Sequence, residues 1–329
     1  MGPSRRPSGA VAPRSRLQRV WLVWWALLAL SCAATDDPEI VVRLTSGPKV
    51  VAGAEVGVDE APLRFVFASV LSPERSTLPA SRFASYLMGR LKRRVEIVRR
   101  KTYAELNDLL RTGSAEAGLV CAGAYTVGRA QFGLRALVTP TVADSATYRA
   151  LVLTRKDSGR TRLEDLRGTV FAFSDPLSNG GYRHVAAALR ALGTTPAAFF
   201  ERTLFTYSHD NTIQAVRDGI ADAGSVDSLI WDDLVRESPA IKDKLVIIDS
   251  SGEFPSNPVV VSPHASQDLA DDLARVLGGM PSDPAGKEVL KDLGISGFVK
   301  LPDAAYDPIA QSWRELGVLP APSADAVRP

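Results

Sequence analysis

The chain has 329 residues, of which 45% are hydrophobic and 23% are charged. This composition is typical of a globular protein and excludes a fibrous or largely disordered chain. The length suffices for two lobes of about 100–200 residues each. Two cysteines and three histidines exclude a disulfide-rich scaffold and argue against a cysteine zinc cage or a multi-histidine centre. We therefore expect neither a metal nor a cofactor.

Residues 1–34 have the pattern of a secretory signal peptide. Five arginines and no acidic residue precede the unbroken apolar run 20–30, and small residues follow it. A basic segment, a short apolar core and small residues at the cleavage site define such a signal. The run is shorter than the about 20 residues that a spanning helix needs. We expect export to the periplasm or the extracellular side, with an uncleaved anchor as the alternative.

Cys32 offers a way of holding the exported protein at a membrane. The residues before it, Ala29-Leu30-Ser31, resemble a bacterial lipobox, in which the cysteine is lipidated and becomes the mature N-terminus. A lipid anchor retains a protein at a membrane without any spanning helix. We expect lipidation at Cys32; the alternative is ordinary cleavage after Ala33 or Ala34.

The expected signal peptide makes the net charge of the whole chain more positive than that of the remainder. It holds five of the 39 basic residues and none of the 37 acidic ones, so the remainder has 34 basic and 37 acidic residues. Its net charge is therefore about −3, which is not the profile of a nucleic-acid-binding protein. We expect no nucleic-acid partner and a monomer.

The first half of the mature chain alternates strands and helices. Residues 35–61 form a polar linker with two short β-like runs, 40–44 and 50–52. Strands are expected at 63–68, 94–98 and 117–120, and helices at 81–91 and 103–111. This order, with short links, indicates a parallel sheet covered by helices.

The same alternation then starts again. Further strands are expected at 148–154, 169–173, 223–226, 245–248 and 258–262, and helices at 161–166, 178–192, 212–219, 267–277 and 285–293. We therefore expect an α/β protein of two lobes, each with a mixed, mostly parallel sheet flanked by helices. Lobe 1 would comprise 62–153 and 256–317, lobe 2 154–255, and residues 318–329 a tail. The chain would cross near 151–156 and 249–258.

The segment from Phe173 to Tyr182 is a candidate anion site. A strand ends, a loop turns and a helix begins at Ser178. Backbone N–H groups at a helix start are unpaired, and with the helix dipole they attract anions. Gly180 and Gly181 would let a ligand approach the backbone closely. The alternative interpretation is a plain helix cap and loop.

A second helix start lies at Tyr207-Ser208-His209-Asp210. His209 could donate a hydrogen bond to an anion, or it could make a structural contact only. Asp210 could instead cap the helix.

Taken in order, these segments resemble the solute-binding proteins of phosphate, phosphite and phosphonate ABC transporters, from about Leu63 to Gly317. No single piece is specific, and the resemblance lies in their order and coverage. The matching pieces are Ser72-Pro73-Glu74, Phe173–Tyr182, Ser208-His209-Asp210, Ala215–Asp227, Ser256-Asn257-Pro258, Asp283-Pro284, Leu293–Phe298 and Tyr306-Asp307-Pro308.

The resemblance implies a type 2 periplasmic binding protein fold with its ligand in the cleft between the lobes. It also implies an ABC permease as membrane partner, or a sensor kinase if the protein signals instead of transporting. The implied ligand-binding residues are Tyr103, Tyr125, Tyr148, Ser178, Asn179, Gly180, Gly181, His209 and Asn257.

Two positions depart from the pattern of the family. Many members have serine or threonine at Asn179, and members that bind aminoalkylphosphonates have an acid where this chain has neutral Asn257. We therefore expect phosphate, phosphite or a simple alkylphosphonate rather than an aminophosphonate. Cys121 follows an expected buried strand, and we expect it to be a buried free thiol.

The expected function is thus an extracytoplasmic binding protein that captures a phosphorus oxyanion for an ABC transporter. A hydrolase using Ser178 and His209 is the competing hypothesis. The sequence contains no Gly-x-Ser-x-Gly elbow and no phosphate-loop lysine motif, so we expect no enzyme. The sequence does not separate transport from sensing.

Overall fold

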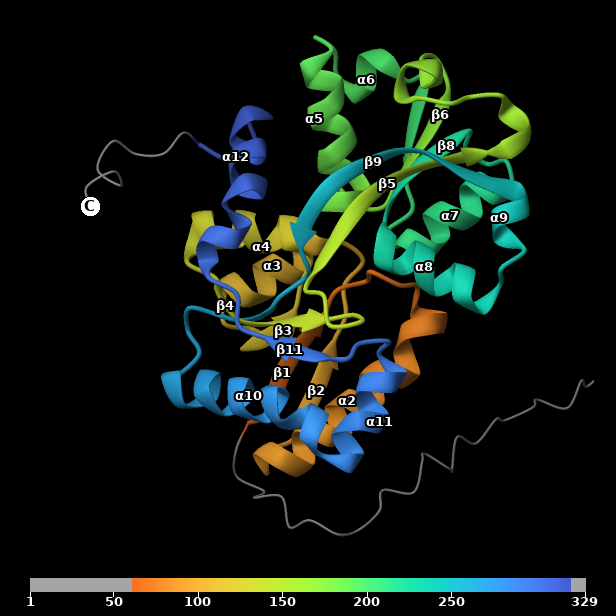
Figure 1. Cartoon of the computed structure of the whole chain (residues 1–329). Helices are drawn as coiled ribbons and strands as arrows, with labels where there is room; N and C mark the ends of the chain where they lie inside the picture. The colour runs from red at the N-terminus through yellow and green to blue at the C-terminus, as the bar shows by residue number, and fades with distance from the viewer. Residues whose placement is uncertain (1–60, 321–329) are drawn as a thin grey trace, which may run out of the picture. The chain divides into compact units, whose positions relative to one another are not determined.

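The computed structural model describes residues 61–320, a single run of alternating strands and helices (Figure 1). The signal peptide, Cys32, the β-like runs expected at 40–44 and 50–52, and residues 321–329 lie outside the described residues. Within 61–320, no helix has the length and apolarity to cross a membrane.

The first sheet has six strands in the order β11-β4-β10-β3-β1-β2. β1 pairs in parallel with β2 and β3, whereas β10 is antiparallel to β3 and β4, and β11 is antiparallel to β4. The strands are β1 (Leu63–Phe67), β2 (Val95–Val98), β3 (Ala117–Leu119), β4 (Arg135–Thr141), β10 (Val259–Val261) and β11 (Gly297–Val299).

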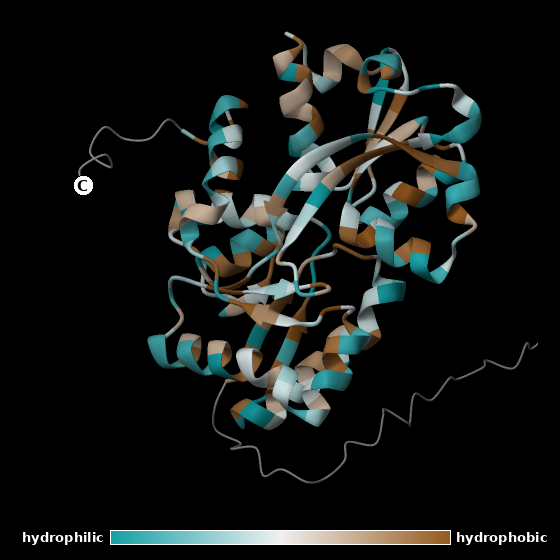
Figure 2. Ribbon diagram, in the orientation of Figure 1, coloured by the Kyte–Doolittle hydropathy of each residue, from teal (hydrophilic) through white to brown (hydrophobic). Residues whose placement is uncertain are grey.

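Helices cover both faces of this sheet because its strands alternate their side chains. In β1, Leu63, Phe65 and Phe67 face one layer of helices, and Val66 faces the other. Apolar residues therefore gather between the sheet and each helical layer (Figure 2). The first layer is α2 (Pro73–Leu91), α10 (Gln267–Gly279) and α11 (Pro284–Asp292), and the second is α3 (Tyr103–Arg111), α4 (Ala122–Phe132) and α12 (Asp307–Glu315).

The second sheet has five strands in the order β7-β6-β8-β5-β9. β6 is parallel to β7 and β8, and β5 is antiparallel to β8 and β9. The strands are β5 (Thr147–Arg155), β6 (Val170–Phe173), β7 (Arg202–Phe205), β8 (Ala223–Asp227) and β9 (Leu245–Pro255). One face packs on α7 (His209–Arg217), α8 (Ser228–Glu237) and α9 (Ile241–Lys244), and the other on α5 (His184–Ala191) and α6 (Pro196–Phe199).

The two mixed α/β units confirm the expected fold class. More of the strand pairs are antiparallel than expected. The antiparallel strands include those that flank the passages between the sheets, namely β4, β5, β9 and β10. The first passage lies at 142–146 rather than 151–156, since β5 bonds to the second sheet along its whole length. The second passage, at 256–258, adjoins the first through the Ser256 N–H, which donates to the Ala146 carbonyl at 2.7 Å.

Several elements differ from the sequence expectation. α2 begins at Pro73 and contains Pro79, so it is eight residues longer at its start than the 81–91 expected. Helix α4 was not expected, because its Gly- and Ala-rich first turns are buried on every side and so show no apolar stripe. β4, α8, β11 and α12 were not expected either.

Candidate functional site

The expected anion site is a buried helix start. After β6 the chain turns through Ser174–Ser178 and enters a π-helical turn, Asn179–Arg183, that continues into α5. Ser178 is fully buried and is the N-cap residue: its Oγ accepts from the Gly181 N–H at 3.0 Å. Turns of this rare type occur frequently at functional sites. The structure therefore places Ser178 as a cap whose hydroxyl proton is still available to a ligand.

Close packing leaves no room for a Cβ at Gly181 and little room for one at Gly180. A Cβ on Gly181 would lie 1.6 Å from the Ser174 Oγ, and one on Gly180 would lie 3.2 Å from the Tyr148 ring. The Ser174 Oγ is buried and has no hydrogen-bond partner among the described residues. A serine hydroxyl without a partner next to this turn is a further donor that the sequence did not reveal.

Asn179 joins the turn to Tyr148 of β5. Its Nδ2 donates to the Tyr148 hydroxyl at 2.6 Å, and its Oδ1 accepts from the Arg183 Nε. Burial raises the pKa of Tyr148 well above its usual value, with the nearby Cys121 and Asp227 adding to the rise. Tyr148 is therefore protonated, and because its oxygen already accepts from Asn179, its own proton is free to be donated.

His209 is held as a neutral donor at the start of α7. Its Nδ1 accepts from the Asp227 backbone N–H at 3.1 Å, which assigns the ring proton to Nε2. Burial lowers the pKa of His209 to about 4. Burial likewise raises the pKa of the Asp227 carboxyl to about 7, and this carboxyl caps α8 by accepting from the Leu229 N–H at 2.8 Å.

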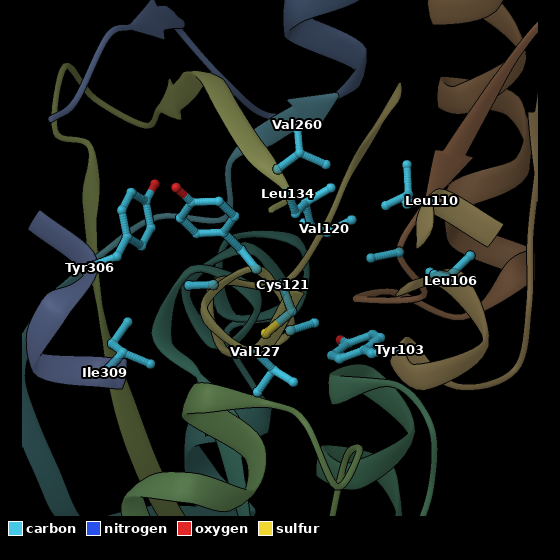
Figure 3. Close-up of a cluster of buried hydrophobic side chains, with 14 of the residues drawn as sticks. Tyr103, Leu106, Leu110, Val120, Cys121, Val127, Leu134, Val260, Tyr306 and Ile309 are labelled. Atoms are coloured by element: carbon cyan, nitrogen blue, oxygen red, sulfur yellow. The ribbon is translucent and has the colours of Figure 1, made fainter. Parts of the chain in front are cut away.

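The first lobe contributes Tyr103, the first residue of α3. Its backbone N–H donates across the lobes to the Asp175 Oδ2 at 3.0 Å. Its hydroxyl is buried and unpartnered among the described residues, and the ring points from α3 towards Cys121 (Figure 3). Burial, then Cys121, Asp175 and other nearby groups, raise the pKa of Tyr103 well above its usual value, so it too is a neutral donor.

Of the two remaining expected residues, one is engaged elsewhere and one lies at the start of α4. The Tyr125 hydroxyl donates to the Asp303 Oδ1 at 2.9 Å, and its ring packs edge-on against Tyr306. The structure therefore does not bring Tyr125 together with the candidate anion turn, Ser178–Arg183. Asn257 is partly buried, and its Oδ1 accepts from the Ala122 N–H at 2.9 Å, which places it at the start of α4.

Direct contacts hold the two lobes together around these groups. The Ser72 N–H donates to the Asp210 Oδ1 at 2.9 Å, and the His209 N–H donates to the Val70 carbonyl at 3.0 Å. Asp210 is thus a link between the lobes, whereas the sequence suggested a helix cap; Ser208 is the cap, its Oγ accepting from the Asn211 N–H.

Sequence analysis missed Ser174, Asp175 and Asp227. All three stand at or just beyond the carboxyl ends of β6 and β8, which is where ligands bind in open α/β sheets. That rule is the signal that could have found them. Within residues 61–320, no three histidine, cysteine, aspartate or glutamate side chains gather as a metal site requires.

Comparison with known proteins leads to the same family as the sequence resemblance. The model of the periplasmic substrate-binding proteins of phosphonate ABC transporters matches residues 65–306. A binding protein component of an ABC phosphonate transporter from Pseudomonas aeruginosa is 21% identical with a TM-score of 0.71, over 81% of this chain and 92% of that chain. PhnD1 from Prochlorococcus marinus, solved with methylphosphonate, is 17% identical with a TM-score of 0.71, over 78% and 98%. These likenesses show a type 2 periplasmic binding protein fold.

Proposed function

Since this chain belongs to the periplasmic substrate-binding proteins of phosphonate ABC transporters, we propose that it captures a compact phosphorus oxyanion at the Ser178–Arg183 turn and delivers it to a membrane permease. The observation that carries the proposal is the set of buried neutral donors around one helix start. Tyr103 and Tyr148 stay protonated, and His209 is neutral with its proton on Nε2.

Neutral donors suit a protein that must release what it binds. Hydrogen bonds to an anion are strong even when the donor is neutral, and a site without a contacting cation does not hold the anion by full charge pairing. Arg183, the cation within the turn, is committed to the Asn179 and Ser312 side chains, the latter at 2.5 Å. Its hydrogen bonds therefore stabilise the turn itself.

The same geometry disfavours hydrolysis. A general base must accept a proton near neutral pH, but burial lowers the pKa of His209 to about 4, and its Nδ1 already accepts from Asp227. The Ser178 Oγ accepts from the Gly181 N–H and has no hydrogen bond to a histidine. We therefore propose binding without catalysis.

The test is titration calorimetry with phosphate, phosphite, methylphosphonate, 2-aminoethylphosphonate and sulfate. We expect at least one compact phosphorus oxyanion to bind in the micromolar range or tighter and to come off chemically unchanged. Binding of none of the phosphorus compounds, or preference for sulfate, would contradict the proposal.

Ligand choice within this class is proposed to depend on Asn257. An ammonium buried without a counter-charge is costly, so 2-aminoethylphosphonate should bind more weakly than methylphosphonate or phosphate. Asn257→Asp keeps the acceptor for the Ala122 N–H and adds the charge, and we expect it to shift preference towards the amine. Competition titrations on both proteins measure this, and Gln267→Glu, at an exposed position at the start of α10, controls for a general effect of charge.

Membership of this family implies an exported protein. We further propose that it acts as a monomer and that Cys32 carries a lipid. Mass spectrometry of the mature N-terminus tests the lipid: a modified Cys32 is expected, and an unmodified terminus beyond Cys32 would overturn it. Light scattering of the purified protein tests the monomer.

A further inference from the structure

Cys121 lies where the helix starts of the two lobes meet. It follows β3 and is the N-cap residue of α4, but its side chain makes no capping hydrogen bond. Two residues on, a Cβ at Gly123 would lie 2.2 Å from the Leu177 carbonyl oxygen and 2.9 Å from the Asn179 nitrogen. The first turn of α4 therefore touches the start of the anion turn from the opposite lobe.

Backbone N–H groups from both lobes lie near the Cys121 sulfur. Those of Asn179, Gly123 and Ala124 favour its thiolate, but burial outweighs them and raises the thiol pKa to about 11. The side chain is thus a neutral thiol, 2% exposed.

A second, independent observation points to a ligand at the same place. Tyr103 is 1% exposed, and its buried hydroxyl has no partner among the described residues. Its ring is directed towards Cys121 (Figure 3). After burial, Cys121 has the largest effect on the pKa of Tyr103. An unpartnered buried hydroxyl is costly, and a bound anion would satisfy it.

We propose that the Cys121 thiol contacts the ligand and faces the substituent that distinguishes phosphate, phosphite and methylphosphonate. The inference rests on the proposed function. A thiol is a weak donor and a weak acceptor and packs like a small apolar group. The hydroxyls of Tyr103 and Tyr148 are stronger partners for the common anionic oxygens, which leaves the sulfur for a P–CH₃ or P–H group. Cys121 therefore favours methylphosphonate or phosphite over phosphate.

The first test replaces the sulfur by oxygen. Cys121→Ser is nearly isosteric and provides a strong donor for P–OH, so the ratio of the phosphate Kd to the methylphosphonate Kd should fall roughly 3- to 10-fold. Cys121→Ala is the matched control: it removes the thiol without adding a donor, and methylphosphonate should remain preferred. An unchanged ratio in a folded serine variant would overturn the inference.

The second test needs no substitution. The full-length protein is treated with a maleimide, and peptide mass spectrometry follows modification at Cys121 alone, so that Cys32 does not interfere. Saturating methylphosphonate should slow the modification at least tenfold, whereas sulfate at the same concentration should not. If the protein binds methylphosphonate but the rate at Cys121 stays the same, the thiol does not contact the ligand. If no phosphorus oxyanion binds at all, it is the proposed function that fails.

Discussion

Asp227 and His209 are joined by a hydrogen bond. Burial disfavours the charged form of each, so it raises the pKa of Asp227 and lowers that of His209. The Asp227 carboxyl titrates near 7 in the folded protein and near about 3.9 when unfolded. The folded state then binds more protons in this interval, and the contribution of Asp227 to stability falls as the pH rises from about 4 to 7. His209, with a pKa of about 4, contributes the opposite slope between about 4 and 6.5. The two partly offset each other in mildly acidic solution.

Asp227→Asn should isolate this effect. Asparagine can still accept from the Leu229 N–H as the cap of α8, but it carries no charge to be buried. Relative to the unmodified protein, we expect the variant to gain roughly 1–3 kcal/mol in free energy of unfolding between pH 5 and 8. Urea denaturation at both values measures it. Asp218→Asn, at an exposed position, is the control, and an equal change in both variants would contradict the assignment.

Ser178→Ala tests the anion turn itself. The hydroxyl caps the turn, so its loss should reduce the free energy of unfolding by about 1 kcal/mol. It should also remove one donor to a charged ligand, weakening binding by roughly tenfold or more. Ser178 is fully buried, so the loss of stability should be detectable.

The control for Ser178→Ala is Ser266→Ala. Ser266 caps α10 in the same way, its Oγ accepting from the Leu269 N–H at 3.2 Å, but it lies in the first lobe, whereas Ser178 lies in the second. Stability should fall in both variants, as measured by denaturant unfolding, and ligand affinity only in Ser178→Ala. Unchanged calorimetric affinity in the folded Ser178 variant would mean that the anion binds elsewhere.

At the scale of elements, the sequence predicts what depends on local pattern. Strand β1 and helix α3 were predicted, and α3 begins at a capping box, a local signal, that joins Thr102 and Glu105. Helix α4 was not predicted, because its sequence has no amphipathic period. The helix start at Ser178 was predicted, and its binding of an anion stays a prediction, whereas the hydrogen bonds of Asp175 and Asp227 depend on partners far along the chain.

Gly123→Ala should separate the two helix starts without harming α4. Alanine is more favourable than glycine within a helix by about 1 kcal/mol, but here its methyl would lie 2.2 Å from the Leu177 oxygen. We expect ligand affinity to fall at least tenfold while the melting temperature without ligand falls little. Gly89→Ala, where nothing lies within 4 Å in α2, should leave affinity unchanged. Equal affinity in both variants would show that this contact does not form in the bound state.

At the scale of the whole molecule, binding requires the lobes to part. The donors Tyr103, Tyr148 and His209 are each at most 3% exposed, so a ligand reaches them only if contacts between the lobes break. Within residues 61–320, two short passages, 142–146 and 256–258, connect the sheets. In the first, Ala143 and Asp144 have φ of 46° and 64°, in the left-handed region that non-glycine residues rarely adopt. The first passage is therefore a tight turn, and we expect the lobes to rotate about these two short passages.

Substitution of Arg75 tests whether this rotation controls binding. It lies on α2 of the first lobe and pairs across to α8, with Glu237 at 2.7 Å and Asp233 at 3.0 Å. Arg75→Gln should favour separated lobes, and a smaller bound-competent population raises the apparent Kd in proportion. Because the pair is partly exposed, the expected loss of affinity is modest, roughly 2- to 5-fold, and it should shrink at high salt.

The matched control for Arg75→Gln is Arg82→Gln on the same helix. Arg82 pairs with Asp292 of α11 at 2.6 Å, within the first lobe, so its loss changes the charge equally but leaves the interlobe contacts intact. Titration calorimetry of both variants with the best ligand, at low and high salt, separates the two effects. If Arg82→Gln weakens binding as much as Arg75→Gln, the loss comes from overall charge. If neither weakens it, the Arg75 pair does not hold the lobes together, and buried contacts such as those at Asp175 and Asp210 do so without it.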